Sequence, residues 1–390
     1  MKGGSVASVT GAMPVVLRTV ACGVLFDALI PLSPFVIKSL GATGPEFQRT
    51  LSIGFFLFSA VQFLAPRFAV HGGIERLLIL STLAVAGLCG LLAFSSTFLG
   101  FSFVLLLMFS VNALGSIAAR ASLRGLLDTQ NFEKATSLGY FLMAAAAIVA
   151  PFFIVAVSTK LHWKWLVILP AVFLCVICLF LPRNSAFRRE HTFSHAGSGF
   201  RGSEFSRILR RRGFHVPLLM GMAAQGLFSS AMISKPFILV DHFGLATSEL
   251  GPLLASIAMG EVLGFYFSGK AAGRFSWQHR MCAALLFQSM ASLAILAAVF
   301  VPSVSLFLAF VGFAVIFFCI VFPLSAAMAL DVPLDERVHA SALYGGVQSL
   351  GGALIVFLLS WAAVSPVVGL AILSILVFLV VSALQYALHR

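Results

Sequence analysis

Long apolar runs, separated by short polar segments, repeat along almost the whole chain. A helix needs about 20 apolar residues to cross the hydrocarbon core of a membrane, and a hydropathy window of about that length divides the chain into twelve such runs. The expected spans are residues 13–35, 49–66, 77–95, 99–123, 135–157, 164–182, 214–237, 248–268, 281–301, 304–329, 340–362 and 366–387. The pattern predicts an all-α membrane protein with twelve transmembrane helices.

The polar segment at residues 183–213 divides these spans into two groups of six. It combines arginines with glycine and serine, a composition typical of a flexible connector. We therefore expect an N-terminal six-helix bundle at residues 1–182 and a C-terminal six-helix bundle at residues 214–390, arranged around a central cavity. Residues 183–213 would form a basic linker that acts only as a tether.

The two groups of spans also share a weak internal repeat. Matching positions lie at an offset of 202 to 204 residues: Pro34-Phe35 with Pro236-Phe237, Leu40-Gly41 with Phe243-Gly244, Glu46 with Glu249, Arg67 with Lys270, and Ser137 and Tyr140 with Ser341 and Tyr344. Each match alone is weak, but a nearly constant offset favours a duplicated unit. Parallel repeats of this kind occur in secondary transporters.

Composition and charge agree with a membrane protein of defined orientation. Hydrophobic residues make up 60% of the chain and charged residues only 10%, against roughly a quarter in soluble domains. Twenty of the 25 lysines and arginines fall on the side of the membrane that carries both termini, which predicts that both termini are cytoplasmic. The basic cluster at 207–212 precedes a span, so we expect contact with membrane lipids and no nucleic acid. We expect a multi-pass protein of a bacterial inner membrane.

Several classes of chemistry find no support in the sequence. It contains no G-x-x-x-x-G-K-[ST] motif for ATP, no H-E-x-x-H motif and no nucleophile elbow. Cys175 and Cys178 form a C-x-x-C inside an apolar run with no histidine or acid nearby. We therefore expect no enzyme activity, no cofactor and no metal site, and a chain that works as a monomer.

Two acidic residues are the candidates for proton coupling. An ionised side chain near the bilayer centre costs at least ~2.5–3.5 kcal/mol, so such residues usually have a function. Of the 13 acids, only Asp27 and Glu261 lie well inside expected spans. A carboxylate in an apolar cavity can hold and release a proton near neutral pH. The alternatives are a structural hydrogen-bonding role for Asp27 and pairing with a basic residue for Glu261.

Other polar residues and prolines in the spans suggest further roles. We expect Arg18 and Lys235 to extend to the membrane surfaces, with substrate contact as the alternative for Lys235. A cytoplasmic charge network that controls gating would use Arg67, Arg120 and Arg124. Mid-span amides could bind substrate or, more commonly, join helices: Gln62, Asn112, Gln225 and Gln348. The prolines expected to break or kink helices are Pro31, Pro34, Pro151 and Pro236.

An ordered set of motifs resembles one known family. The first span reads FDALIPLSP from Phe26, the fourth ends NALGSIAARASLRGLL, Ala150-Pro151 stands in the fifth, and W-K-W precedes the sixth. SKPFILVDHFGLATSELG and ASALYGGVQSLGGAL follow in the second half. Together these resemble the drug/proton antiporters of the major facilitator superfamily, in the subgroup of bicyclomycin-resistance and chloramphenicol-efflux proteins. The resemblance implies the major facilitator fold.

The chain also departs from that family's pattern. Ala69 stands where the loop after the second span should carry an aspartate, Phe109 where the fourth span should carry an arginine, and Gly125 where an acid should follow Arg124. These departures concern the family's cytoplasmic latch and its buried arginine.

The function expected from the sequence is proton-coupled transport of a small molecule. The first reading is an exporter of lipophilic or amphiphilic compounds by alternating access, which the forty phenylalanines would suit. The alternative keeps the fold and changes the cargo to an anionic metabolite or siderophore, exported or imported. The few acids, Arg18 and Lys235 favour this second reading.

The predicted topology can be tested with reporter fusions. Reporters fused after residues 42, 160 and 244 should show periplasmic activity. Reporters fused after residues 72, 200 and 275 should show cytoplasmic activity, because the excess of positive charge keeps these segments on the cytoplasmic side. Activity is measured for a periplasmic and a cytoplasmic reporter at each site. One reproducible inversion among the six would contradict the topology.

Overall fold

The computed structural model describes residues 9–158, 163–181, 202–245, 247–333, 336–361 and 365–389. Twelve long helices occur in this part of the chain: α1 (Met13–Leu40), α2 (Gly44–Gln62), α4 (Ile74–Phe94), α5 (Phe98–Leu126), α6 (Thr129–Ser158), α7 (Lys164–Phe180), α10 (Arg212–Phe237), α11 (Thr247–Ala271), α12 (Trp277–Phe300), α13 (Val304–Ala329), α14 (Arg337–Trp361) and α15 (Pro366–His389). Each expected span falls on one of them. Seven of the described helices are long and apolar enough to cross a membrane by length and composition.

Shorter helical segments connect some of these helices. A 3-10 turn (Val9–Ala12) precedes α1, α3 (Ala65–Gly72) lies between α2 and α4, α9 (Gly202–Leu209) precedes α10, and a π-helical turn (Ile238–His242) follows α10. Within a bilayer a helix satisfies its own backbone hydrogen bonds, which is why an apolar chain of this kind folds almost entirely into helices.

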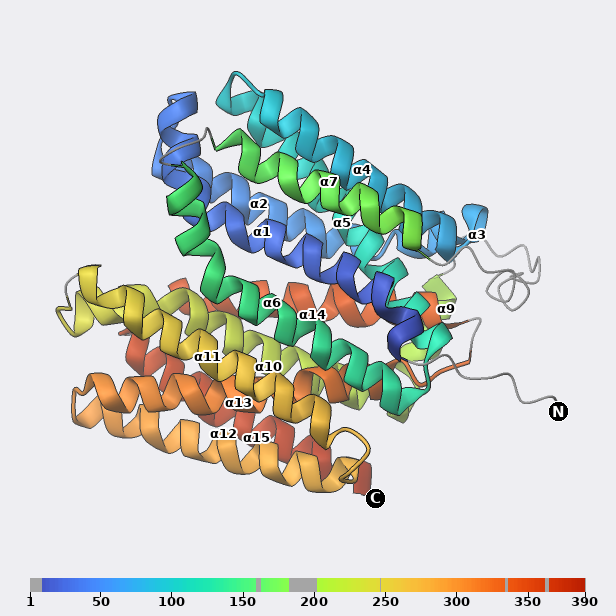
Figure 1. The fold of residues 1–390 in the computed structure, drawn as a ribbon. Coiled ribbons are helices and arrows are strands. Elements are labelled where there is room, and N and C mark those ends of the chain that lie inside the picture. Colours follow the sequence, from blue (N-terminus) through green and yellow to red (C-terminus); the bar gives the residue numbers. More distant parts are fainter. Residues whose placement is uncertain are drawn as a thin grey trace.

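The helices form two groups that face each other (Figure 1). Figure 1 shows α1, α2, α4, α5 and α7 on one side, α10, α11, α12, α13 and α15 on the other, and α6 and α14 along the boundary. Buried apolar side chains form two clusters, one mainly from the first six long helices and one mainly from the last six. The groups meet through α6 with α11 and through α2 with α14. We call this boundary the seam.

The start of α1 and the end of α15 lie at the same end of the molecule, which we call the terminal end (Figure 1). The turn between α1 and α2 lies at the opposite end. Six of the long helices precede the segment 183–213 and six follow it. This arrangement fixes the direction of every helix: α1, α4, α6, α10, α12 and α14 start at the terminal end.

Three of the four prolines expected to break helices do not interrupt them. α1 continues past Pro31 and Pro34 to Leu40, and α6 continues past Pro151 to Ser158. A proline removes one backbone hydrogen bond, and in a membrane bundle neighbouring groups can compensate for it. Near Pro236, by contrast, α10 ends one residue later and a π-helical turn follows. The expected break therefore occurs only in the second half.

Two glycines of the internal repeat occupy the same special conformation. Gly41 caps α1 with φ 64°, and its N–H donates to the carbonyl of Ile37. Gly244, its match in the repeat, has φ 68° after the π-helical turn. A residue with a Cβ atom is strained in this left-handed region, whereas glycine is not. The repeat seen in the sequence therefore includes a backbone requirement.

Replacing these glycines should destabilise the protein. Gly41→Ala and Gly244→Ala should each lower the free energy of unfolding by about 1–2 kcal/mol, because alanine is strained at positive φ. Gly312→Ala is the matched control, since Gly312 lies inside α13 and a Cβ there meets nothing within 4 Å. It should leave stability unchanged or raise it by up to about 1 kcal/mol. Thermal unfolding in detergent measures all three, and equal effects at the three sites would contradict this account.

Candidate functional site

Three charged residues from both groups of helices are linked by electrostatic interactions with one of them, Glu261. Asp27 lies on α1, Lys235 near the end of α10 and Glu261 on α11. Glu261 lies within electrostatic reach of both Asp27 and Lys235. The side chain of Asp27 is exposed at the surface of the described atoms. The two acids singled out from the sequence are therefore brought together across the seam.

Secondary contacts fix the positions of two of these residues. The backbone carbonyl of Glu261 accepts a hydrogen bond from Cys319 Sγ of α13 at 3.8 Å, and a Cβ on Gly264 would meet the same sulfur. Lys235 Nζ lies 3.0 Å from the sulfur of Met232, one turn earlier on α10. Lys235 is half-buried, and its expected extension to the membrane surface stays a prediction.

Aromatic rings lie next to the acidic residues on both sides of the seam. Phe26 adjoins Asp27 in the chain, and its ring lies 4.5 Å from that of Phe109. In the second half, Phe265 lies one turn beyond Glu261 and stacks on Tyr140 of α6, with ring centroids 5.2 Å apart. Tyr140 also makes an edge contact with Phe322 of α13 at 4.7 Å. α6 thus inserts an aromatic side chain from the first half into the second.

Arg18 is completely enclosed within the first half. Only 1% of its surface is exposed. Its Nε donates to Thr82 Oγ1 at 3.3 Å and its Nη2 donates to Asn112 Oδ1 at 3.1 Å, and no described carboxylate forms an ion pair with it. The expectation that Arg18 reaches the membrane surface is wrong, because side-chain acceptors on α4 and α5 hold it inside the bundle.

Phe109 occupies the position in the fourth span where the family resemblance implies an arginine, and Arg18 supplies a buried arginine from another helix. The Phe109 ring fills the space beside Gly54, where a Cβ would overlap it. The buried guanidinium comes instead from α1, and it reaches Asn112, three residues after Phe109 on the same helix α5. A buried arginine is therefore present in the first half, although not at the position that the family resemblance implied.

Most of the four amides proposed as substrate contacts have hydrogen-bond partners within the protein, and a substrate role for them stays a prediction. Asn112 is occupied by Arg18, Gln62 is fully buried at the seam, and Gln225 donates to Ser229 Oγ one turn further along α10 at 2.9 Å. Gln348 on α14 is buried, and its Nε2 has no hydrogen-bond partner among the described atoms. Three of the four amides thus bond to neighbouring side chains, which is the commoner use of such residues.

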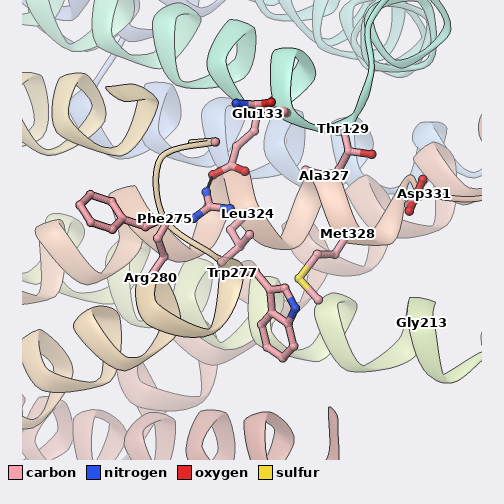
Figure 2. Close-up of a pocket in the computed structure, with 12 residues that line it drawn as sticks. Thr129, Glu133, Gly213, Phe275, Trp277, Arg280, Leu324, Ala327, Met328 and Asp331 are labelled. Carbon is pink, nitrogen blue, oxygen red and sulfur yellow. Dashed lines mark hydrogen bonds and ion pairs between the residues drawn. The ribbon is translucent and has the colours of Figure 1, made fainter. Parts of the chain in front are cut away.

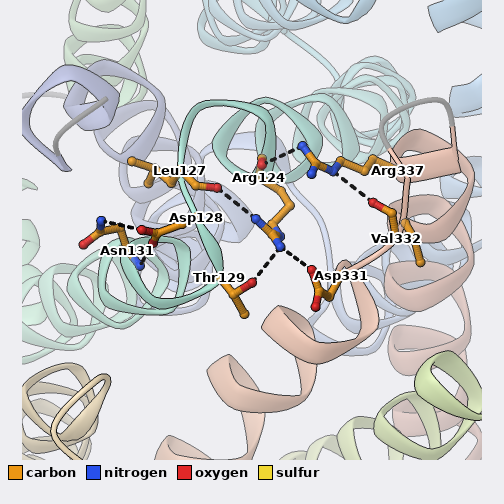
Figure 3. A network of polar contacts seen from close by, with 8 residues as sticks. All are labelled: Arg124, Leu127, Asp128, Thr129, Asn131, Asp331, Val332 and Arg337. Atoms are coloured by element: carbon orange, nitrogen blue, oxygen red, sulfur yellow. Dashed lines mark hydrogen bonds and ion pairs between the residues drawn. The ribbon is translucent and has the colours of Figure 1, made fainter. Parts of the chain in front are cut away.

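Arg124 is the centre of a polar network at the terminal end (Figure 3). It donates to the carbonyl of Leu127, to Thr129 Oγ1 at 2.7 Å and to Asp331 Oδ1 at 2.6 Å. Arg337 donates to the carbonyl of Arg124 at 2.9 Å. Asp331 and Arg337 belong to the second half, so the network joins the halves. Arg67 is an exposed residue of α3. A role of Arg67, Arg120 and Arg124 in gating stays a prediction.

A second ion pair crosses the seam between α6 and α12 (Figure 2). Glu133 and Arg280 are bonded to each other, and the exposed fractions of their side chains are only 3% and 12%. The pair borders a cavity of about 500 Å³ that Trp277, Met328 and Asp331 also line. This cavity does not include Asp27 or Glu261. The sequence analysis missed the pair, because the two residues lie at the ends of spans and only the packing of the halves reveals that they meet.

Glycines let α14 approach α2 and α5 closely. Arg120 Nη2 donates to Gln62 Oε1 at 2.9 Å, and a Cβ on Gly345 would overlap both side chains. A Cβ on the next residue, Gly346, would overlap the ring of Phe63. Gln62 also donates weakly to Ser349 at 3.5 Å. Arg120 therefore belongs to the contacts that close the seam.

The linker does more than connect the two halves. In α9, Phe205 makes edge contacts with Phe63 at the end of α2 and with His339 of α14, and Ile208 is fully buried. Arg207 and Arg211 both form ion pairs with the buried Glu336, at 3.0 and 2.9 Å. This differs from the expected simple tether, because two apolar residues on one face of α9 pack against both halves. The remaining linker residues up to 201 lie outside the described residues.

Comparison with known proteins assigns the class of protein that this fold and these sites define. The molecule is a multi-pass membrane transporter with the major facilitator fold, twelve transmembrane helices in two six-helix bundles. A model of the Major Facilitator Superfamily matches residues 16–356. The chain therefore belongs to the major facilitator superfamily. A search of curated proteins finds no match.

Solved structures share this fold at low sequence identity. The human organic anion transporter TETRAN has 16% identity and a TM-score of 0.77, covering 95% of this chain and 98% of its own. The fucose transporter FucP in the outward conformation has 15% identity and a TM-score of 0.76, covering 96% and 97%. A variant of the E. coli fucose:proton symporter FucP has 14% identity and a TM-score of 0.78, covering 97% of this chain and 98% of its own.

Breaking the Glu133–Arg280 pair should destabilise the protein, and removing both charges should not. Arg280→Met leaves a buried carboxylate without its partner, which should cost about 3–5 kcal/mol. The double variant Glu133→Gln/Arg280→Met should recover most of that loss, and Arg76→Gln, at an exposed arginine of α4, is the control for lost positive charge. Thermal unfolding in detergent measures the series. A double variant as unstable as the single one would show that the pair itself is not responsible.

Proposed function

We propose that this protein is a proton-coupled secondary transporter that exports small lipophilic or amphiphilic compounds by antiport. The observation that carries the proposal is the approach of Asp27 and Glu261 from opposite halves, with Lys235 in electrostatic reach of Glu261. The motifs shared with bicyclomycin-resistance and chloramphenicol-efflux proteins support the same subgroup. The chain belongs to a family of membrane transporters, and its sequence contains no nucleotide-binding motif. Both observations agree with transport driven by an ion gradient.

Competition between a proton and the cargo supplies the coupling. A protonated Asp27 is compatible with an apolar surrounding such as the rings of Phe26 and Phe109, whereas an ionised Asp27 requires water or a cationic group. A cationic cargo that contacts Asp27 therefore favours the ionised state of this side chain and releases its proton. Binding of cargo and binding of a proton then oppose each other, and this opposition is the basis of antiport.

We also propose that the terminal end faces the cytoplasm of a bacterial inner membrane and that this conformation is closed there. The excess of positive charge on the side of the termini supports the orientation. The networks around Arg124 and Glu133 join the halves at that end. Alternating access would require both to separate while contacts form at the opposite end. A monomer contains both halves and would be sufficient.

The alternative is a transporter of an organic anion, such as an anionic metabolite or a siderophore. Lys235 is the observation that favours it, because this cation lies within electrostatic reach of Glu261. Arg18, which the sequence offered as a second cation for an anion, is enclosed and bonded to Thr82 and Asn112. The remaining support is therefore one lysine beside a carboxylate, which is weaker support than the pair of acids.

Replacing Asp27 tests the proposed coupling. Asp27→Asn mimics the protonated acid, so it should abolish proton-driven accumulation and remove the pH dependence of substrate binding while binding itself remains measurable. Glu46→Gln is the matched control, because Glu46 is exposed in the first turn of α2 and its pKa is lowered by hydrogen bonds from the hydroxyl and amide of Thr43. Binding and uptake are measured in proteoliposomes with an imposed pH gradient. Uphill transport by Asp27→Asn with an unchanged pH profile would leave Asp27 a structural role and make Glu261 the acid to replace next.

The same vesicles distinguish the two cargo classes. Proton release driven by lipophilic cations or neutral drugs supports the export proposal, and flux of organic anions that is lost in Lys235→Gln supports the alternative. A growth screen of an expressing strain against toxic compounds and under iron limitation would select the compounds to test.

A further inference from the structure

A groove follows the seam between α6 and α11 near the terminal end, separate from the acidic residues. Its volume is about 630 Å³. From α6 it is lined by residues spaced along one face of the helix, and from α11 and the turn that follows by a second set. The lining residues are Gln130, Lys134, Leu138, Phe141, Phe265, Tyr266, Gly269, Lys270, Ala272, Gly273 and Arg274. Figure 1 shows α6 running beside α11.

The groove carries positive charge that no residue of its lining neutralises. Lys134, Lys270 and Arg274 line it, and none of the lining residues is acidic. No ion pair involves these three residues in the described part of the chain. Glu133 is the neighbour of Lys134 in the chain, but it is bonded to Arg280 and borders the other cavity. The three cations are therefore available to an anion from outside the protein.

Cationic and apolar residues are ordered along the groove. On α6, Leu138 and Phe141 lie one and two turns beyond Lys134, further from the terminal end, so the apolar part begins about 6 Å along the helix from the cation. On α11, which runs the other way, Tyr266 lies one turn deeper than Lys270, and Lys270 Nζ sits 4.4 Å from the centre of the Tyr266 ring. Phe141 and Tyr266 face each other across the seam with ring centroids 6.0 Å apart. The positive charge therefore lies at the mouth of the groove, near the terminal end, and the aromatic side chains lie further along the groove, away from that end.

The outer wall of the groove is exposed on the surface of the helices. Tyr266, which lines the groove, is 42% exposed, and the next residue, Phe267, which does not line it, is 61% exposed. In a membrane these residues contact lipid. An occupant of the groove can therefore enter from the bilayer without passing through the protein.

We propose that this groove binds an anionic phospholipid. The phosphate lies among Lys134, Lys270 and Arg274, and an acyl chain follows Leu138, Phe141 and Tyr266 towards the middle of the bilayer. Basic pockets between membrane helices bind anionic head groups through such contacts. Free phosphate matches only the mouth of the groove, whereas a phospholipid also covers its apolar part. The bound lipid contacts α6 of the first half and α11 of the second, so it stabilises the packing of the halves at this seam.

Lipid retention by the purified full chain tests the proposal. Native mass spectrometry compares phosphatidylglycerol with phosphatidylcholine for the unmodified protein and for Lys134→Gln/Lys270→Gln/Arg274→Gln. We expect about tenfold weaker retention of phosphatidylglycerol in the triple variant and no change for phosphatidylcholine, because three charges near the head group are lost. The matched control is Lys38→Gln/Arg49→Gln/Arg76→Gln, which removes three exposed cations outside the groove and should retain phosphatidylglycerol to within about twofold of the unmodified protein.

Thermal unfolding supplies the second measurement. Phosphatidylglycerol should raise the unfolding temperature of the unmodified protein more than phosphatidylcholine does, inorganic phosphate should not, and the difference should disappear in the triple variant. Arg274→Gln alone, in the exposed turn after α11, should weaken retention about threefold and serves if the triple variant does not fold. Equal retention by groove and control variants, or equal stabilisation by inorganic phosphate, would overturn the proposal. The result is independent of the role of Asp27.

Discussion

The cost of taking a charge out of water governs how this molecule is arranged. Each ionised group inside a bilayer must be paired, hydrogen-bonded or kept beside water. Arg18 meets this requirement with Thr82 and Asn112, and Glu133 meets it with Arg280. The side chain of Asp27 is instead exposed, so its charge is not enclosed by protein. The chain thus contains buried charges that hold helices together and, in Asp27, a charge with no such role among the described contacts, which is the one proposed above to carry a proton.

The two kinds of charge are mechanically connected through α6. Glu133 lies in the first turns of this helix and Tyr140 lies two turns further, among the rings of Phe265 and Phe322. Because both residues belong to one helix, a movement of α6 that parts the Glu133–Arg280 pair also displaces Tyr140 from the second half. A change at the terminal end therefore reaches the neighbourhood of Glu261 without any intervening loop.

The sequence was sufficient to predict the helices, but it was not sufficient to predict most of the contacts between them. Apolar runs locate helices because a membrane span has a fixed length, and every expected span coincides with a helix. α1 extends five residues beyond its expected end because Pro31 and Pro34 do not stop it. The rarity of acids in the spans identified Asp27 and Glu261, which do lie near each other.

The contacts missed from the sequence depend on the packing of the two halves. The pairing of Glu133 with Arg280, the bonds from Arg124 to Asp331 and the docking of Phe205 on both halves join residues that are far apart in the chain. Arg18 was misjudged for a related reason, since its acceptors Thr82 and Asn112 belong to other helices. Hydropathy describes how a helix meets lipid, and it contains no information on which helix faces which.

The pair Gly345-Gly346 gives α14 a bare surface at the seam. Side chains of the first half, those of Gln62, Phe63 and Arg120, lie directly on its backbone. At these two positions α14 offers only backbone, whereas Ser349, one turn further, accepts a weak hydrogen bond from Gln62. In the movement proposed above, the first-half side chains would leave the glycine backbone without any rotamer of these two residues having to change. The charged pairs at the terminal end would then contribute most of the resistance to opening, and the glycines the ease of closing again.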